Sequence, residues 1–189
     1  MKVAFVCYDG LTVLDLVGAY DPITRLSTMG FMALDWDLCG STETATGTGG
    51  MTITADRIRP DLGDYDLVFV PGGVETRELI DDRAVIDWLR SAADCDLKTS
   101  VCTGSLLLGE AGLLAGKRAT THPAAFELLE PYCEVVDDRV VEDGDVITGR
   151  GVSTSIDLGL YLVETIADPE TRGAIADQMD YPYGSTVFG

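Results

Sequence analysis

The sequence predicts a single α/β domain whose mostly parallel sheet is covered by helices on both faces. Strand patterns and helix patterns alternate along the chain, as they do in proteins with such a sheet. The 189 residues suit one domain, and a hydrophobic content of 46% is enough to fill its core. No repeat, low-complexity stretch or linker divides the chain, so residues 1–189 are expected to form one unit.

Short apolar runs bounded by turn residues predict the strands. Residues 2–7, 66–70 and 99–101 are the expected buried strands, followed by Asp9-Gly10, by Pro71-Gly72-Gly73 and by Cys102 respectively. Further strands are expected at 32–39, 119–121, 134–136, 140–142 and 146–148, the last two joined by a turn at Asp143-Gly144. The Gly- and Thr-rich stretch 46–55 fits either an edge strand or a hairpin.

Helices are expected between these strands. Apolar residues of the stretch 13–26 have helical spacing, but Asp21-Pro22 resembles an N-cap followed by a first-turn proline. We therefore predict a turn around Asp15 and a helix that begins at Pro22. The other predicted helices are 82–93, 104–114, 123–129, 153–167 and a last one that opens at Asp168-Pro169, whereas 181–189 shows no period.

The charge balance is strongly acidic. The chain has 32 acidic and 13 basic residues, for a net charge of -19, and its only lysines are Lys2, Lys98 and Lys117. Such a surface repels phosphates, which argues against binding to nucleic acid. It suits a protein that works in concentrated salt, where self-repulsion is screened. An acidic protein of an ordinary cytoplasm is the alternative, and the scarcity of lysine favours the halophilic interpretation.

The cysteine and histidine content argues against disulfides and metal. Five cysteines form no C-x-x-C pair, and His122 is the only histidine, so neither a disulfide framework nor a metal site is predicted. The chain has neither a signal-peptide pattern nor an apolar run of membrane-spanning length. No P-loop or dinucleotide fingerprint follows the first strand. A cytoplasmic protein without a membrane segment is the prediction.

Cys102 is the candidate nucleophile. It stands between an apolar strand and a helix and is followed by Thr103-Gly104, the arrangement of a nucleophile elbow. The helix N-terminus is expected to lower the pKa of its thiol. The alternative is a buried structural cysteine, the usual role of a cysteine in a core strand.

Other candidates follow the neighbouring strands. The backbone N–H groups of Gly72 and Gly73, with that of Thr103, are expected to face a developing anion, although Gly-Gly alone also fits a plain turn. Asp15 lies in a mostly apolar stretch and is the candidate acid or base, against the alternative of a solvated carboxylate. His122 could orient the thiol or be a structural histidine.

The stretch 101–109 and the Ala-Gly-Leu-Leu at 111–114 resemble the elbow of the ThiJ/PfpI superfamily, and most of all its isonitrile hydratase branch. This superfamily includes the parkinsonism-associated deglycase and is similar to class I glutamine amidotransferases. The resemblance extends over nearly the whole chain through the segments 14–18, 70–73, 117–122, 147–152 and 155–157.

The resemblance implies a flavodoxin-like three-layer sandwich, a homodimer, a small-molecule substrate and no cofactor. It implies that Cys102 attacks an isonitrile, that Asp15 delivers a proton, that Thr103 assists and that an N-formamide is formed. Thr103 replaces the histidine of the peptidase branch, which argues against proteolysis, and Asp15 replaces the glutamate of the glyoxalase branch. A glyoxalase-like or deglycase-like enzyme for reactive carbonyls and a ligand-binding or redox-sensing module remain the alternatives.

Overall fold

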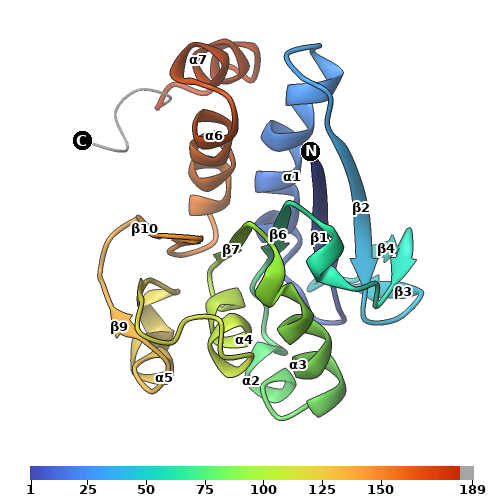
Figure 1. Ribbon diagram of the computed structural model, residues 1–189, viewed down its shortest axis with the longest axis vertical. Helices are drawn as coiled ribbons and strands as arrows, with labels where there is room; N and C mark the ends of the chain where they lie inside the picture. Colours follow the sequence, from blue (N-terminus) through green and yellow to red (C-terminus); the bar gives the residue numbers. More distant parts are fainter. Residues whose placement is uncertain (184–189) are drawn as a thin grey trace.

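A seven-stranded sheet forms the middle layer of the computed structural model, which describes residues 1–183 (Figure 1). Its strands are β1 Lys2–Cys7, β2 Asp35–Gly40, β5 Arg57–Ile58, β6 Leu67–Val70, β7 Leu97–Val101, β10 Val140–Asp143 and β11 Val146–Gly149. They lie in the order β10-β11-β7-β6-β1-β2-β5. All neighbouring strands are parallel except β10, which is antiparallel to β11.

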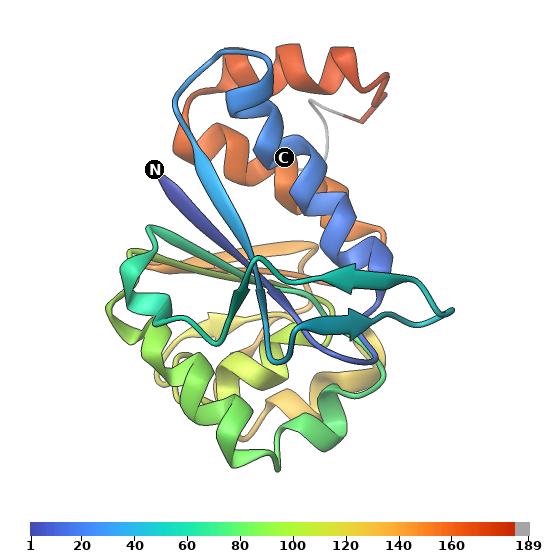
Figure 2. The ribbon, with the colours of Figure 1, turned by 90° about the vertical axis from the view of Figure 1, so that its right-hand side faces the viewer.

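Helices cover both faces of this sheet, as Figure 2 shows. One layer contains α1 Val13–Thr28, α6 Thr154–Ile166 and α7 Pro169–Gln178. The other contains α2 Thr76–Leu79, α3 Arg83–Arg90, α4 Gly104–Glu110 and α5 Phe126–Leu129. The central strands β6 and β7 are buried because both of their faces are covered. The predicted flavodoxin-like sandwich is confirmed.

Two small sheets lie outside the main one. The strands β3 Thr44–Thr46 and β4 Thr52–Thr54 form an antiparallel hairpin, so the hairpin is the correct alternative for this stretch. The strands β8 Arg118–Ala119 and β9 Glu134–Val135 pair in parallel. Short 3₁₀ turns complete the fold at Leu62–Asp64, Ser91–Asp94 and Pro123–Ala125.

The predicted start of the first helix is wrong. Helix α1 is continuous from Val13, with Asp15 in its first turn and Pro22 inside it, rather than beginning at Pro22. An internal proline removes one backbone hydrogen bond and crowds the preceding turn. Packing of α1 on α6 offsets this cost, because Pro22 is buried against Gly159, where even a methyl group would come within 2.5 Å of the proline ring.

Helix α4 is shorter than predicted. The expected helix 104–114 ends at Glu110, and the chain continues in turns. Gly112 and Gly116 adopt φ values of +83° and +73°, which lie in the left-handed region that a helix cannot use. The apolar pattern continues past Glu110, but Gly112, directly after the C-cap residue Ala111, ends the helix.

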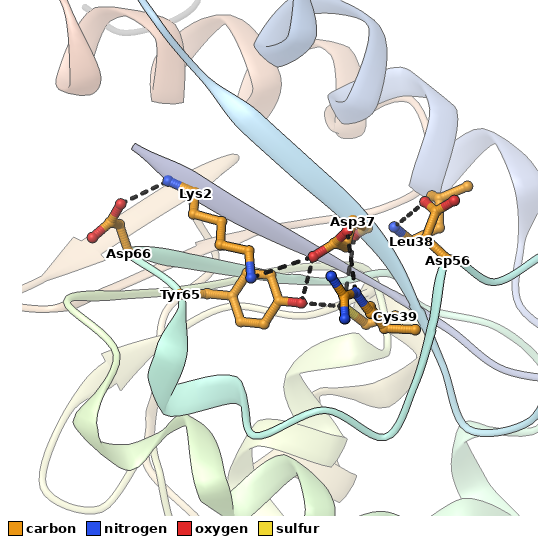
Figure 3. A network of polar contacts seen from close by, with 8 residues as sticks. Lys2, Asp37, Leu38, Cys39, Asp56, Tyr65 and Asp66 are labelled. Carbon is orange, nitrogen blue, oxygen red and sulfur yellow. Dashed lines mark hydrogen bonds and ion pairs between the residues drawn. The ribbon is translucent and has the colours of Figure 1, made fainter.

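A polar network joins the starts of β1 and β6 to the strand β2 (Figure 3). The Tyr65 hydroxyl donates to Asp37 Oδ2 at 2.7 Å, and Lys2 Nζ lies 3.4 Å from the same oxygen. The backbone N–H of Lys2 donates to Asp66 Oδ2 at 2.6 Å. These contacts lie at the amino ends of the strands, whereas the candidate site residues follow the carboxyl ends, at the opposite edge of the sheet.

The strand order creates a switch point at β1. The chain runs from β1 to β2 on one side and later returns to β6 on the other side of β1. In open α/β sheets, ligands bind outside the carboxyl ends of the strands at such a point. Because β1, β6 and β7 are neighbours, the features that follow them meet at one edge, as predicted. No helix within the described residues is long and apolar enough to cross a membrane.

Candidate active site

Cys102 lies on a sharp turn between β7 and α4. Its φ is +55°, a left-handed conformation that residues other than glycine rarely adopt. The turn is held by the Cys102 N–H, which is bonded to the carbonyls of Gly149 at 3.0 Å and Arg150 at 2.7 Å. Position 104 needs a glycine, because a Cβ there would lie only 2.3 Å from the Val70 carbonyl oxygen. This is the geometry of the predicted nucleophile elbow.

Asp15 is buried beside the elbow and has no solvent exposure. Its Oδ2 accepts a hydrogen bond from the Gly72 N–H at 3.0 Å. Its Oδ1 has no hydrogen-bond partner among the described residues. The carboxyl group and the Cys102 thiol are nevertheless close enough for each to affect the pKa of the other. The alternative of a solvated carboxylate is therefore wrong for Asp15. Oδ1 is therefore free to hold a proton.

Burial sets the proton affinity of both groups. It raises the pKa of Asp15 to about 7, against the opposing effects of Cys102 and the Gly72 N–H. It also raises the pKa of the Cys102 thiol to about 12, and the charge of Asp15 acts in the same direction. Since the low dielectric disfavours two adjacent negative charges, the pair keeps at least one proton at neutral pH.

The predicted lowering of the Cys102 pKa is therefore wrong. The Thr103 N–H at the start of α4 does stabilise the thiolate, but desolvation of the buried sulfur outweighs it. Helix α4 has seven residues, so its dipole is small. Cys102 is also not the most acidic cysteine, because the pKa values of Cys39 and Cys133 are raised only to about 11.

The Pro71-Gly72-Gly73 loop is bonded to the elbow. The Gly73 N–H donates to Thr103 Oγ1, and the Thr103 hydroxyl lies at the same distance, 3.1 Å, from the Gly73 carbonyl oxygen. Both N–H groups expected to face an anion thus have partners within the protein, Asp15 for Gly72 and Thr103 for Gly73. Gly72 is needed for another reason: a Cβ there would lie 2.6 Å from Thr103 N and 2.8 Å from Asp15 Oδ2.

A hollow of about 190 Å³ opens above the sulfur, and both Cys102 and His122 line it. The Nδ1 of His122 accepts a hydrogen bond from the Ala124 N–H at 3.1 Å. Within residues 1–183 this is the one hydrogen bond of the ring, and none joins it to the Cys102 sulfur.

Three buried residues support the site without having been singled out from the sequence. The Tyr8 hydroxyl donates to the Pro71 carbonyl at 2.5 Å, and burial raises its pKa well above the usual value. The Thr121 hydroxyl donates to the Cys102 carbonyl at 2.9 Å, and the Ser155 hydroxyl lies between the carbonyls of Val152 at 2.8 Å and Leu14 at 3.0 Å. Tyr8 directly follows β1, a position that could have indicated its role.

The five cysteines form no disulfide, and three of them, Cys7, Cys39 and Cys95, are buried away from the hollow. Within residues 1–183 no group of three or more histidine, cysteine or acidic side chains is placed to hold a metal ion.

Known proteins are similar to this chain in sequence and in fold. The DJ-1/PfpI family model matches residues 1–165. Isonitrile hydratase of Pseudomonas putida is 36% identical over 183 residues, which cover 96% of this chain and 78% of that protein. Protein DJ-1alpha of Drosophila melanogaster is 36% identical over 124 residues, which cover 64% of this chain and 57% of that protein.

A solved ThiJ/PfpI family protein from Pseudomonas syringae superposes with a TM-score of 0.89 at 30% identity, over 96% of this chain and 75% of that one. The family match spans most of the chain and includes Asp15 and the elbow. The resemblance stated from the sequence is thus confirmed, and the chain belongs to the DJ-1/PfpI family.

Proposed function

We propose that this protein is a cysteine-dependent hydratase that combines an isonitrile with water to give an N-formamide. The observation that carries the proposal is the burial of Asp15 beside Cys102 at the switch point of the sheet. The 36% identity with an isonitrile hydratase supports the same reaction. Addition of water needs no electron acceptor, so the proposal includes no cofactor. It also includes a homodimer, as the family resemblance implies, and the cytoplasmic location expected from the sequence.

In the first step the sulfur of Cys102 forms a bond to the terminal carbon of the isonitrile. Asp15, whose pKa is about 7, is partly ionised at neutral pH and takes the thiol proton as the bond forms. It then passes this proton to the same carbon, which leaves a thioimidate, R–N=CH–S–Cys. One proton moves from sulfur to carbon, so the buried site gains no net charge.

In the second step water adds to the thioimidate carbon while the nitrogen takes a proton. Asp15 again accepts and returns a proton, and the tetrahedral adduct is R–NH–CH(OH)–S–Cys. The C–S bond then breaks, the sulfur recovers a proton, and R–NH–CHO leaves. The Thr103 N–H, which stabilises negative charge on the sulfur, assists both the attack and the departure of Cys102.

The test is a turnover assay in molar potassium chloride with an alkyl isonitrile and, separately, with a 2-oxoaldehyde. We expect N-formamide to accumulate, as followed by NMR, and the oxoaldehyde to be consumed no faster than by the Cys102→Ser variant. Formation of a 2-hydroxy acid without any formamide would assign the glyoxalase-like alternative. No turnover of either compound, with Cys102 oxidised by dilute peroxide, would support the redox-sensing alternative.

A further inference from the structure

We propose that the substrate carries a carboxylate and that Arg77 binds it above Cys102. This inference rests on the proposed function, for which it names the class of substrate. Arg77 belongs to α2, which packs against α4, and lines the same hollow as Cys102, Thr103 and His122. The argument comes from the charges around this hollow.

No acidic side chain lines the hollow above Cys102. An adjoining hollow of about 570 Å³ shares His122 and Val152 with it and is lined by Arg139 and Arg150, again without an acidic residue. Three other hollows among the described residues are each lined by acidic side chains: Asp87 and Glu110 in one, Asp9, Glu75 and Asp82 in the next, Glu164 and Asp177 in the last.

This contrast is informative in a chain with 32 acidic and 13 basic residues. The net charge of -19 repels anions from most of the surface. These two hollows form a patch lined by arginines and by no acidic side chain, so the repulsion of anions is weaker there than over the rest of the surface. Arg77 lines the hollow that opens onto Cys102, and Arg139 and Arg150 line the adjoining one.

Arg77 is the cation of this patch that has no protein partner. Arg139 is paired with the buried Asp157, and Arg150 Nη1 lies 2.9 Å from Asp137 Oδ1. The Arg77 side chain makes no ion pair or hydrogen bond with any other residue in the part of the chain that the structure describes. Its planar guanidinium can bind both oxygens of a carboxylate at once.

His122 supplies a second donor. Because its Nδ1 accepts the Ala124 N–H, the proton of the neutral ring is on Nε2. Both donors line the hollow of about 190 Å³ that opens onto Cys102. The carboxylate is therefore separated by a few bonds from the isonitrile carbon that reaches Cys102.

The experiment compares two isonitriles of the same length, one ending in a carboxylate and the other in the primary amide. We expect the wild-type protein to favour the carboxylate in kcat/KM. The Arg77→Gln variant should lower kcat/KM about 10- to 100-fold for the carboxylate, the value of a charge-assisted hydrogen bond, and lower kcat/KM much less for the amide, which carries no charge. Equal effects on the two compounds, or no effect, would overturn the inference.

Arg83→Gln is the matched control. Arg83 lies on α3, also makes no ion pair among the described residues, and lines the hollow that contains Asp87 and Glu110. The change removes the same charge from the protein, so a general electrostatic effect would appear in both variants. We expect Arg83→Gln to leave the preference for the carboxylate unchanged, and loss of that preference in this variant would also overturn the inference.

A binding measurement separates this inference from the proposed function. The two N-formamides that correspond to these isonitriles are titrated into wild-type and Arg77→Gln protein by calorimetry. Tighter binding of the carboxylate form, lost in Arg77→Gln, supports the inference even if neither isonitrile is turned over, in which case the hydratase proposal fails alone. Equal binding of the two formamides by the wild-type protein refutes the inference even if isonitriles are hydrated.

Discussion

A carboxyl group from another part of the chain lies beside each end of strand β7, and the pKa values of the two groups are shifted in opposite directions. At the carboxyl end, beside Cys102, burial raises the pKa of Asp15 to about 7. At the amino end, hydrogen bonds from Lys117 at 2.5 Å and Lys98 at 2.6 Å lower the pKa of Asp145 to about 2. The same type of side chain is thus a fixed negative charge at one end and a group that exchanges a proton near neutral pH at the other.

The two pKa values differ because the two carboxyl groups have different hydrogen-bond partners and different exposure to solvent. The Asp145 side chain is 43% exposed and is bonded to two of the three lysines of the chain, whereas Asp15 is fully buried with one backbone N–H and a thiol. A cation near Asp15 would lower its pKa and remove its ability to exchange a proton at neutral pH. The absence of lysine near Asp15 is therefore as important for its role as the apolar residues that cover it.

The largest expected effect is that of Cys102→Ser, which should abolish turnover. A hydroxyl is much less acidic than a thiol, and a carboxylate whose pKa is about 7 is too weak a base to activate it. Steady-state kinetics on the turned-over compound gives the answer, with circular dichroism to show that the variant is folded. Full activity in a folded Cys102→Ser protein would end the case for this class of enzyme.

The next effect separates the two carboxyl groups. Asp15→Asn removes the transferable proton and should lower kcat by roughly 100- to 10,000-fold, the range typical of losing a general acid or base. Asp145→Asn is the matched control, because it makes the same change at the other end of β7 and should change kcat little. If both variants lost activity to the same extent, the assignment of Asp15 to proton transfer would be wrong.

Stability should respond in opposite directions to the same two variants. Asp15 ionises near 3.8 in the unfolded chain and near 7 in the folded one, so its contribution to stability is lost as the pH rises from about 4 to about 7. Asp145 has a lowered pKa, so its contribution is present above about pH 4 and is lost as the pH falls towards 2.

At about pH 8, removing the charge of Asp15 raises the free energy of unfolding by up to about 4 kcal/mol. The unpaired amide of the asparagine in Asp15→Asn offsets about 1–3 kcal/mol of this gain. Asp145→Asn should cost about 1 kcal/mol, since half-exposed ion pairs are screened by solvent. Urea unfolding at about pH 8 and about pH 4 measures both. An Asp15→Asn protein that is less stable than wild type at about pH 8 would contradict the raised pKa.

A smaller effect concerns the reactivity of the thiol. The charge of Asp15 raises the pKa of Cys102, so Asp15→Asn should speed alkylation of Cys102 several-fold near pH 8. Cys133, whose pKa is raised by burial alone, provides the reference within the same protein. Brief iodoacetamide labelling followed by mass spectrometry reports both sites. An unchanged ratio of Cys102 to Cys133 labelling would show that the two groups do not interact.

The smallest effect is a shift of a few degrees with salt. The screening length is about 10 Å in 0.1 M salt and about 3 Å in 1 M salt, so the self-repulsion of a chain with a net charge of -19 should weaken. The thermal midpoint should rise with potassium chloride to molar levels, although the Asp145 ion pairs weaken at the same time. Greatest stability in dilute buffer would refute the halophilic interpretation.

Much of the site could be predicted because its signals are local. The apolar strand, the nucleophile and Gly104 two positions later lie close together in the chain, and this local pattern predicts the elbow. The strand ends also predicted that Asp15, Gly72 and Cys102 would meet, since parallel strands present their carboxyl ends at the same edge. Arg77 gave no signal, because nothing in the sequence distinguishes it from the other arginines on exposed positions.

The sequence by itself determined the alternation of strands and helices, the acidic composition and the pattern of strand, cysteine and glycine that predicts the elbow, because these depend on neighbours along the chain. Only the tertiary structure decided that α1 continues through Pro22, since Gly159 of α6 provides the space for its ring. It also decided the proton affinities of Asp15 and Cys102. Desolvation depends on which elements cover a group, and those elements come from distant parts of the chain.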